Sequence, residues 1–138
     1  MKKVVAFGTF DLVHPGHVHM LKEAKSYGDY LVVIIARDET VKAVKRHQPL
    51  HDENTRLSHV DKLGIADKVR LGNLGDKFLV IDEEKPDIVA LGYDQKVRID
   101  KLSAALEDHV KIVRLSPFKP EVYKSSKLKK YEDLGSNH

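Results

Sequence analysis

The sequence predicts an open, doubly wound α/β fold: a parallel, five-stranded sheet with helices on both faces. Short runs rich in Val, Ile and Leu alternate with longer amphipathic stretches along the chain, and several runs are apolar on both faces. Such strands are typical of a covered parallel sheet, and a regular β-α alternation is typical of a Rossmann-like arrangement. The expected strands are residues 3–7, 30–36, 68–71, 87–91 and 111–115.

The stretches between these strands carry helical patterns. Val18, Leu21 and Ala24 recur at a three-residue spacing that buries one face of a helix, and Gly28 is a natural stop before the second strand. The expected helices are residues 16–26, 53–63, 76–84, 99–108 and a last one from about 125 to 131. Neither a repeat nor a linker interrupts the pattern, so we expect residues 1–138 to form one domain.

The composition excludes several classes of protein. The chain of 138 residues has no cysteine, which rules out disulfides, a thiolate nucleophile and a Cys-ligated zinc site, and which fits a reducing compartment. Its net charge of +3 is small and the charges are mixed in sign, so nucleic-acid binding is not indicated. The apolar run at the N-terminus is too short for a signal peptide or a membrane span. We therefore expect a cytoplasmic protein that binds neither nucleic acid nor a membrane.

The residues after the first strand predict a phosphate site. Gly8-Thr9-Phe10-Asp11 is followed by His14-Pro15-Gly16-His17, which brings two imidazoles to the start of an expected helix. Backbone N–H groups and the dipole at a helix N-terminus favour an anion, and doubly wound sheets bind ligands beyond the carboxyl ends of their strands. A zinc site is the other functional option, but a His-x-x-His pair in a turn matches the i, i+4 zinc motif poorly.

These residues carry a resemblance to a known family. The two tetrapeptides resemble the signature of the HxGH nucleotidylyltransferase superfamily. Tyr123-Lys124-Ser125-Ser126-Lys127 is similar to the family's second signature, a Ser/Thr-rich turn that opens the last helix, and Arg56 is similar to the arginine of its third helix. The resemblance extends from Val4 to about Lys130.

The resemblance implies nucleotidyl transfer, in which a substrate phosphate attacks the α-phosphate of a nucleoside triphosphate and pyrophosphate leaves. Catalysis would come from positioning and charge stabilisation, with His14 and His17 donating hydrogen bonds to the α-phosphate and the bridging oxygen. Lys45 is a further catalytic candidate. Lys42, Lys45 and Arg46 are expected in a loop that closes over the substrate phosphate, and a solvated basic helix face is the alternative.

The remaining candidates lie after strands or at the last helix. Ser125 and Ser126 would cradle the β- and γ-phosphates, and Lys124 or Lys127 would neutralise them. Asp11 would either hold its loop or help to place the Mg²⁺ carried with the triphosphate, and no protein-bound metal is expected. The nucleotide-binding candidates are Gly8, Thr9, Phe10, Asp11, Gly16, Gly92, Asp94, Lys124, Ser125, Ser126 and Lys127. The substrate-binding candidates are Asp38, Lys42, Arg56, Tyr93 and Gln95.

Two groups of small, single-domain relatives resemble the chain most, and the archaeal-type FAD synthases (FMN adenylyltransferases) are favoured. Residues 36–42, 91–95 and 123–127 are similar to that group, whereas the tryptophan typical of glycerol-3-phosphate cytidylyltransferases after the fourth strand is absent. The resemblance therefore implies ATP and FMN as substrates, a flavin at the site and a homodimer. CTP with glycerol 3-phosphate or a sugar phosphate is the alternative.

A function of another class also stays open. The alternatives are a non-catalytic nucleotide-binding regulator and a protein whose lysine-rich residues 119–130 bind nucleic acid. The presence of both histidines favours the enzyme, and the shortage of aromatic residues in the lysine-rich segment disfavours base stacking.

Overall fold

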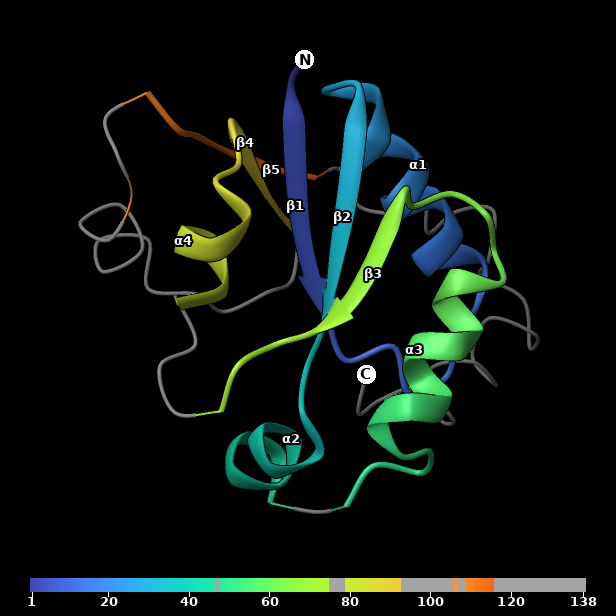
Figure 1. The fold of residues 1–138 in the computed structure, drawn as a ribbon. Coiled ribbons are helices and arrows are strands. Elements are labelled where there is room, and N and C mark those ends of the chain that lie inside the picture. Colours follow the sequence, from blue (N-terminus) through green and yellow to red (C-terminus); the bar gives the residue numbers. More distant parts are fainter. Residues whose placement is uncertain (47, 75–78, 93–105, 107–108, 116–138) are drawn as a thin grey trace.

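The computed structural model describes residues 1–46, 48–74, 79–92, 106 and 109–115, and its centre is one parallel sheet (Figure 1). The five strands lie in the order β3-β2-β1-β4-β5. Their bounds are β1 Lys3–Gly8, β2 Tyr30–Ile35, β3 Lys68–Leu71, β4 Ile88–Leu91 and β5 Lys111–Arg114. Each agrees with the expected strand to within one residue at either end. Strand order reverses between β1 and β4, so the carboxyl ends of these two strands border the crevice where such folds bind ligands.

Helices cover both faces of the sheet, as predicted. The described helices are α1 Pro15–Ser26, α2 Asp38–Lys45, α3 Glu53–Asp61 and α4 Leu79–Glu84. Helices α1 and α3 lie on one side of the sheet and α4 lies on the other (Figure 1). The expected helix over residues 99–108 lies outside the described residues apart from Leu106, and the one over 125–131 lies entirely outside them.

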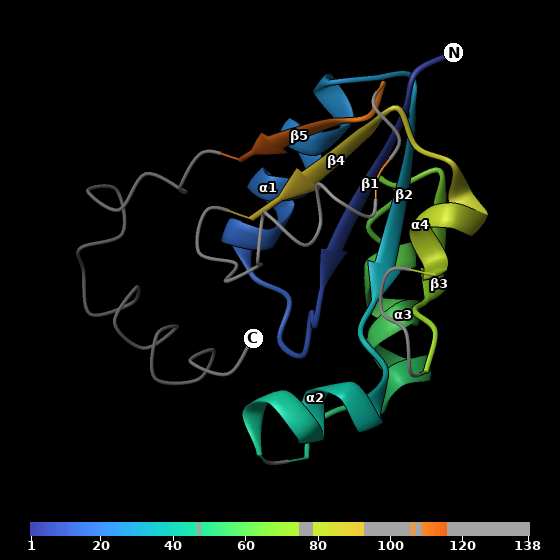
Figure 2. The same cartoon turned by 90° about the vertical axis from the view of Figure 1, so that its left-hand side faces the viewer.

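Helix α2 corrects the expectation of a loop. Lys42 and Lys45 belong to this helix, and Arg46 is its C-cap in the left-handed region with φ of 61°. The helix forms because Asp38 and Glu39 place acidic side chains in its first turn, where the helix dipole favours them, and because Val41 is buried beneath it. It lies beyond the carboxyl ends of the strands (Figure 2).

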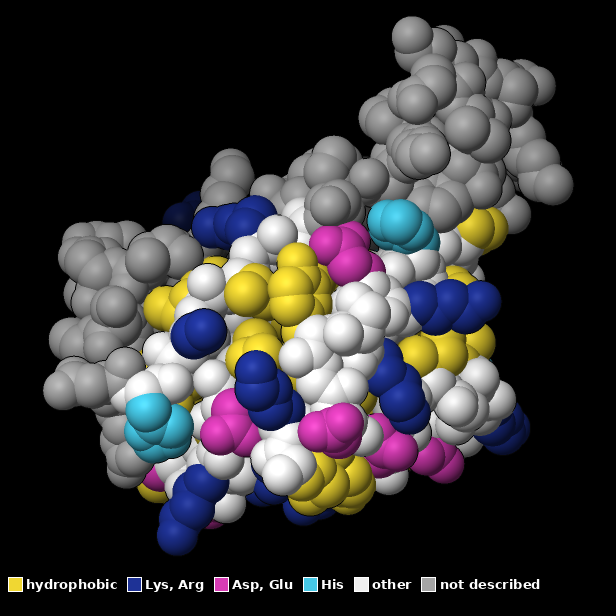
Figure 3. All heavy atoms as spheres, turned by 90° about the horizontal axis from the view of Figure 1, so that it is seen from above, with side chains coloured by type: hydrophobic (Ala, Val, Ile, Leu, Met, Phe, Trp, Pro, Cys, Tyr) yellow, Lys and Arg dark blue, Asp and Glu magenta, His cyan; other side chains and the backbone are white. Residues whose placement is uncertain are grey.

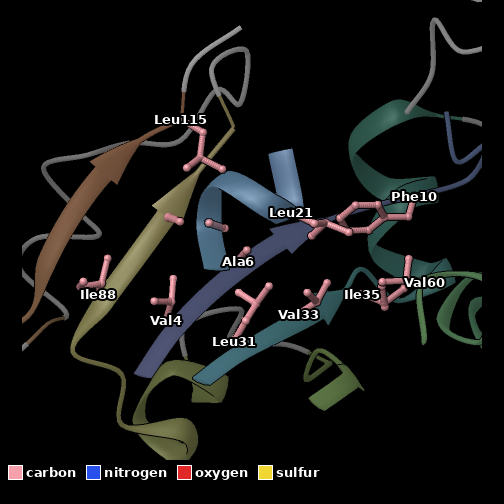
Figure 4. Packing of buried hydrophobic residues seen from close by; sticks show 12 residues of the cluster. Val4, Ala6, Phe10, Leu21, Leu31, Val33, Ile35, Val60, Ile88 and Leu115 are labelled. Carbon is pink, nitrogen blue, oxygen red and sulfur yellow. The ribbon is translucent and has the colours of Figure 1, made fainter. Parts of the chain in front are cut away.

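The core consists of two apolar layers separated by the sheet. Val4 and Ala6 of β1 face α1 and α3 in one layer (Figure 4), whereas Val5 faces α4 in the other. This alternation follows from the period of two in a β-strand, and it explains why the strands are apolar throughout. Phe10 and Leu115, which follow β1 and β5, extend the first layer just beyond the carboxyl ends of the strands.

The amino ends of the strands are fixed by charged side chains. Figure 3 looks onto this end of the molecule, where basic and acidic side chains are interspersed. Three aspartates that precede strands accept backbone N–H groups, and the bond from Leu31 lowers the pKa of Asp67. The bonds run from Lys2 N to Asp29, from Lys3 N to Asp87 and from Leu31 N to Asp67, each 2.8 Å long.

Glu84 at the end of α4 is a buried carboxylate that joins this helix to two strands. Its oxygens lie 3.0 Å from Lys3 Nζ, 2.8 Å from Lys68 Nζ and 2.9 Å from Arg70 Nη1. Burial alone would raise the pKa of Glu84, but the hydrogen bonds from the three cations outweigh burial and lower the pKa to about 2. Glu84 therefore stays ionised and ties α4 to β1 and β3.

Candidate functional site

The exit from β1 is shaped by Phe10, which folds back over the end of its own strand (Figure 4). Phe10 has φ of 54° and is only 1% exposed, because its ring packs in the core. A Cβ built on Gly8 would lie 2.3 Å from that ring. Gly8 is therefore required by the Phe10 ring, and the turn that follows carries Thr9 and Asp11 above the core.

His14 and His17 form a reciprocal cap at the start of α1. His14 is the N-cap, and its Nδ1 accepts from Gly16 N at 3.1 Å. The Nδ1 of His17 in turn accepts from His14 N at 3.3 Å. The two ring centroids are 4.2 Å apart, so the imidazoles lie side by side as the sequence predicts.

This cap fixes the chemistry of both rings. An Nδ1 that accepts a hydrogen bond carries no proton, so each neutral ring carries its proton on Nε2 and donates from there. Burial lowers the pKa of His14, which favours its neutral form near pH 7. The pair therefore offers two Nε2–H donors of defined tautomer, oriented by the backbone of the first helical turn.

The cap also changes how an anion would meet the helix. The sequence suggested free N–H groups at this terminus, but Pro15 has none and Gly16 N is bonded to His14 Nδ1. The N–H groups of His17 and Val18 both donate to His14 O. An anion at α1 would thus be bound by imidazole donors and the helix dipole rather than by free backbone groups. A His at N-cap with a His three residues later is the capping-box spacing, which was the available sequence signal.

Asp11 was predicted to hold its own loop or to help to place Mg²⁺, and in the structure its side chain binds the backbone of a different segment. Its side chain is 2% exposed, and its two oxygens accept from Leu50 N at 2.7 Å and His51 N at 2.9 Å. Both oxygens are engaged by the segment that leads into α3. Among the described residues, no group of three His, Asp or Glu side chains could hold a metal ion.

Arg56 connects three segments beneath the site. Its guanidinium donates to Thr9 O at 2.8 Å, His51 O at 3.0 Å and Asp38 Oδ1 at 2.6 Å. The arginine side chain is fully buried, whereas that of Asp38 is about one-third exposed. From the sequence, Arg56 was predicted to contact the substrate. In the structure its guanidinium is buried and instead fixes the residues after β1 relative to the first turn of α2.

The first turns of α2 and α3 cap each other. Asp38 N donates to Glu53 Oε1 at 2.9 Å, and Glu53 N donates to Asp38 Oδ2 at 3.2 Å. Each acidic residue thereby satisfies one N–H that its partner helix leaves without an intrahelical acceptor. Sequence periodicity within a single helix carries no sign of this contact between helices.

Lys42, another predicted substrate-binding residue, is exposed further along α2.

The carboxyl end of β4 borders the other side of the crevice. Gly92 follows β4, and its carbonyl accepts from Arg114 Nη1 of β5 at 3.0 Å. Arg114 was missed from the sequence, where the only signal was a basic residue inside an expected strand. The other predicted residues of this side lie outside the described part of the chain: Tyr93, Asp94, Gln95, Lys124, Ser125, Ser126 and Lys127.

Comparison with known proteins identifies the family. Residues 5–136 match the family described as cytidylyltransferase-like. The chain belongs to this family. Among the relatives of this cytidylyltransferase-like chain is an FAD synthase of Thermoplasma volcanium, 42% identical over 133 residues, which cover 94% of the chain and 93% of the relative. An FAD synthase of Haloferax volcanii is 46% identical over 107 residues, covering 78% and 74%.

A solved structure supports the same assignment. The crystal structure of the lipopolysaccharide core biosynthesis protein of Thermoplasma volcanium matches with a TM-score of 0.81 at 43% identity, covering 86% of this chain and 99% of that one. The superfamily resemblance and the doubly wound fold are thus confirmed for this cytidylyltransferase-like chain. No helix among the described residues is long and apolar enough to span a membrane.

Proposed function

We propose that this chain is an FMN adenylyltransferase, which transfers AMP from ATP to the phosphate of FMN and releases FAD and pyrophosphate. The observation that carries the proposal is the pair of capped imidazoles at the end of β1, in which each Nδ1 accepts a backbone hydrogen bond and each neutral ring therefore carries its proton on Nε2. The similarity to archaeal FAD synthases over most of the chain supports the adenylyl donor and the flavin acceptor.

The reaction needs no protein nucleophile. An oxygen of the FMN phosphate attacks the α-phosphorus of ATP, and the bond to the bridging oxygen of pyrophosphate breaks. His14 and His17 donate from Nε2 to the α-phosphate and to the bridging oxygen, where negative charge grows in the transition state. The α1 dipole adds to this stabilisation, and the fixed tautomers mean that little reorganisation is needed.

The other assignments follow from the resemblance to the family. Thr9, Gly16, Gly92 and Asp94 border the nucleotide, with Ser125, Ser126 and their flanking lysines on the β- and γ-phosphates. Lys42 and Lys45 bind on the acceptor side, together with Tyr93 and Gln95. Mg²⁺ arrives with ATP as part of the substrate, and the enzyme acts as a cytoplasmic homodimer.

Product formation tests the proposal directly. The purified protein is supplied with ATP plus FMN or with CTP plus glycerol 3-phosphate, and both pyrophosphate and the flavin product are measured. We expect FAD only from the first pair. Turnover of the second pair alone would reassign the acceptor, and tight nucleotide binding without any turnover would indicate a regulator.

A histidine variant tests the role of the imidazole pair. His17→Ala should lower kcat by about 10²–10³-fold, the usual cost of losing one donor to developing charge. His19→Ala is the matched control, because His19 lies two residues further along α1 and pairs with Glu23 at 3.7 Å. Equal rates in the two variants would contradict the proposed role.

A further inference from the structure

Arg37 lies just after the carboxyl end of β2, and the Nε of its guanidinium lacks a hydrogen-bond acceptor in the described part of the chain. It follows β2 and serves as the N-cap of α2, with a side chain that is 28% exposed. Its Nε is buried without a hydrogen-bond partner among the described residues. A buried N–H of this kind is costly and rare, and a functional role is one of the explanations for it.

A single ion pair holds the guanidinium without filling its donors. Glu53 Oε2 lies 3.7 Å from Arg37 Nε, which is too long for a hydrogen bond. The other oxygen of Glu53 is already bonded to Asp38 N at 2.9 Å. Arg56 is different, since each of its three guanidinium nitrogens donates to an acceptor. Arg37 thus carries a guanidinium that the neighbouring carboxylate does not hydrogen-bond, and a guanidinium suits the oxygens of a phosphate.

The sheet topology assigns this guanidinium to one side of the reaction. Strand β1 lies between β2 and β4, and Ala36 N donates to Gly8 O at 3.0 Å, so Arg37 begins beside the β1 exit. The nucleotide belongs to the crevice between β1 and β4, where strand order reverses. Arg37 lies across β1 from that crevice, at the end of β2, where the attacking substrate would approach the imidazole pair.

We propose that Arg37 binds the phosphate group of the acceptor substrate. This assignment rests on the proposed function, in which that phosphate is the attacking group. Arg37 would hold it beside the β1 exit and neutralise part of its charge as it approaches the α-phosphate of ATP. Glu53 would keep the guanidinium in place before the acceptor arrives.

Flavin binding with and without the phosphate provides the test. FMN and riboflavin share the ring system and differ by the phosphate, so flavin fluorescence titrations of wild type, Arg37→Ala and Arg37→Lys isolate the contribution of that group. We expect Arg37→Ala to weaken FMN binding about 10- to 100-fold and to leave riboflavin binding unchanged. Arg37→Lys keeps the charge but loses the planar guanidinium, so its affinity for FMN should lie between those of wild type and Arg37→Ala.

Two further measurements separate the alternatives. Lys62→Ala is the control, because it removes an exposed cation at the opposite end of α3 from Glu53 and should not alter either flavin affinity. ATP titrations identify the other phosphate source: loss of ATP affinity with unchanged FMN affinity would place Arg37 on the nucleotide and overturn the proposal. An equal loss for FMN and riboflavin would show a merely structural effect and would also overturn it.

The outcome for the wild type keeps the two proposals distinct. A wild type that makes FAD supports the proposed function whatever Arg37 does. A wild type that makes no FAD but uses another phosphorylated acceptor overturns the flavin assignment, and the same variants are then compared on that acceptor and its dephosphorylated form. If no phosphorylated acceptor is used, both proposals fail.

Discussion

Replacing Glu84 by glutamine should destabilise the protein in a manner that depends on pH. The folded protein lowers the pKa of Glu84 from 4.5 to about 2, and at about 1.4 kcal/mol per pH unit this corresponds to roughly 3 kcal/mol of stability. A lowered carboxyl pKa stabilises the fold fully above pH 4.5, and the contribution is lost as pH falls towards 2. Glutamine keeps the shape but loses the charge beside three cations.

Urea unfolding at two pH values measures this contribution. We expect Glu84→Gln to lower the free energy of unfolding by about 3 kcal/mol at pH 7 and by about 2 kcal/mol at pH 3.5. Glu83→Gln is the matched control, because Glu83 makes the same charge change one residue away but is 44% exposed and bonds only Arg70 among the described residues. We expect Glu83→Gln to lower the free energy of unfolding by less than about 1 kcal/mol. The reasoning would be refuted if the two variants lost equal free energy of unfolding. It would also be refuted if the difference between wild type and Glu84→Gln were as large at pH 3.5 as at pH 7.

Three further predictions follow from the site. His14 should titrate below pH 6.5, because its burial disfavours the charged ring, and an NMR midpoint at or above 6.5 would contradict this. Gly8→Ala should cost about 1–3 kcal/mol in urea unfolding, since the new Cβ meets the Phe10 ring at 2.3 Å; shortening Phe10 to leucine in the same chain should recover part of the loss. Arg56→Lys should cost at least about 2 kcal/mol, because one ammonium cannot reach three acceptors in fork geometry, and an unchanged unfolding midpoint would show that the fork is not needed.

The sequence predicted the sheet and the position of the histidine pair because both depend on local patterns. Val4 is buried on one face of β1 and Val5 on the other. An apolar run that covers both faces of a strand can be recognised from the sequence. The histidine pair was likewise found by its spacing after a strand. These signals are properties of short segments, and the fold preserves them.

The errors arose where contacts between distant segments decide the outcome. Arg56 was assigned to a substrate, yet it is completely buried and donates hydrogen bonds to Thr9 and Asp38, both distant in sequence. The basic residues after β2 suggested a loop, but the acidic first turn and the burial of Val41 make them a helix. Arg37 received no role at all, because the lack of a described hydrogen-bond partner for its Nε is a property of the folded environment.

The reciprocal caps have a mechanical consequence for catalysis. Since Asp38 and Glu53 each hold the other's helix, α2 cannot swing alone when a substrate arrives. A displacement of its first turn either breaks these bonds or pulls α3 with it, and Arg56 transmits the same pull to Thr9. Binding of a molecule at the end of β2 would therefore be coupled mechanically to the loop that contains Thr9 and leads to the two histidines. A closure of α2 over a bound molecule that keeps these bonds would leave the first turn in place and move the opposite end, near the left-handed Arg46.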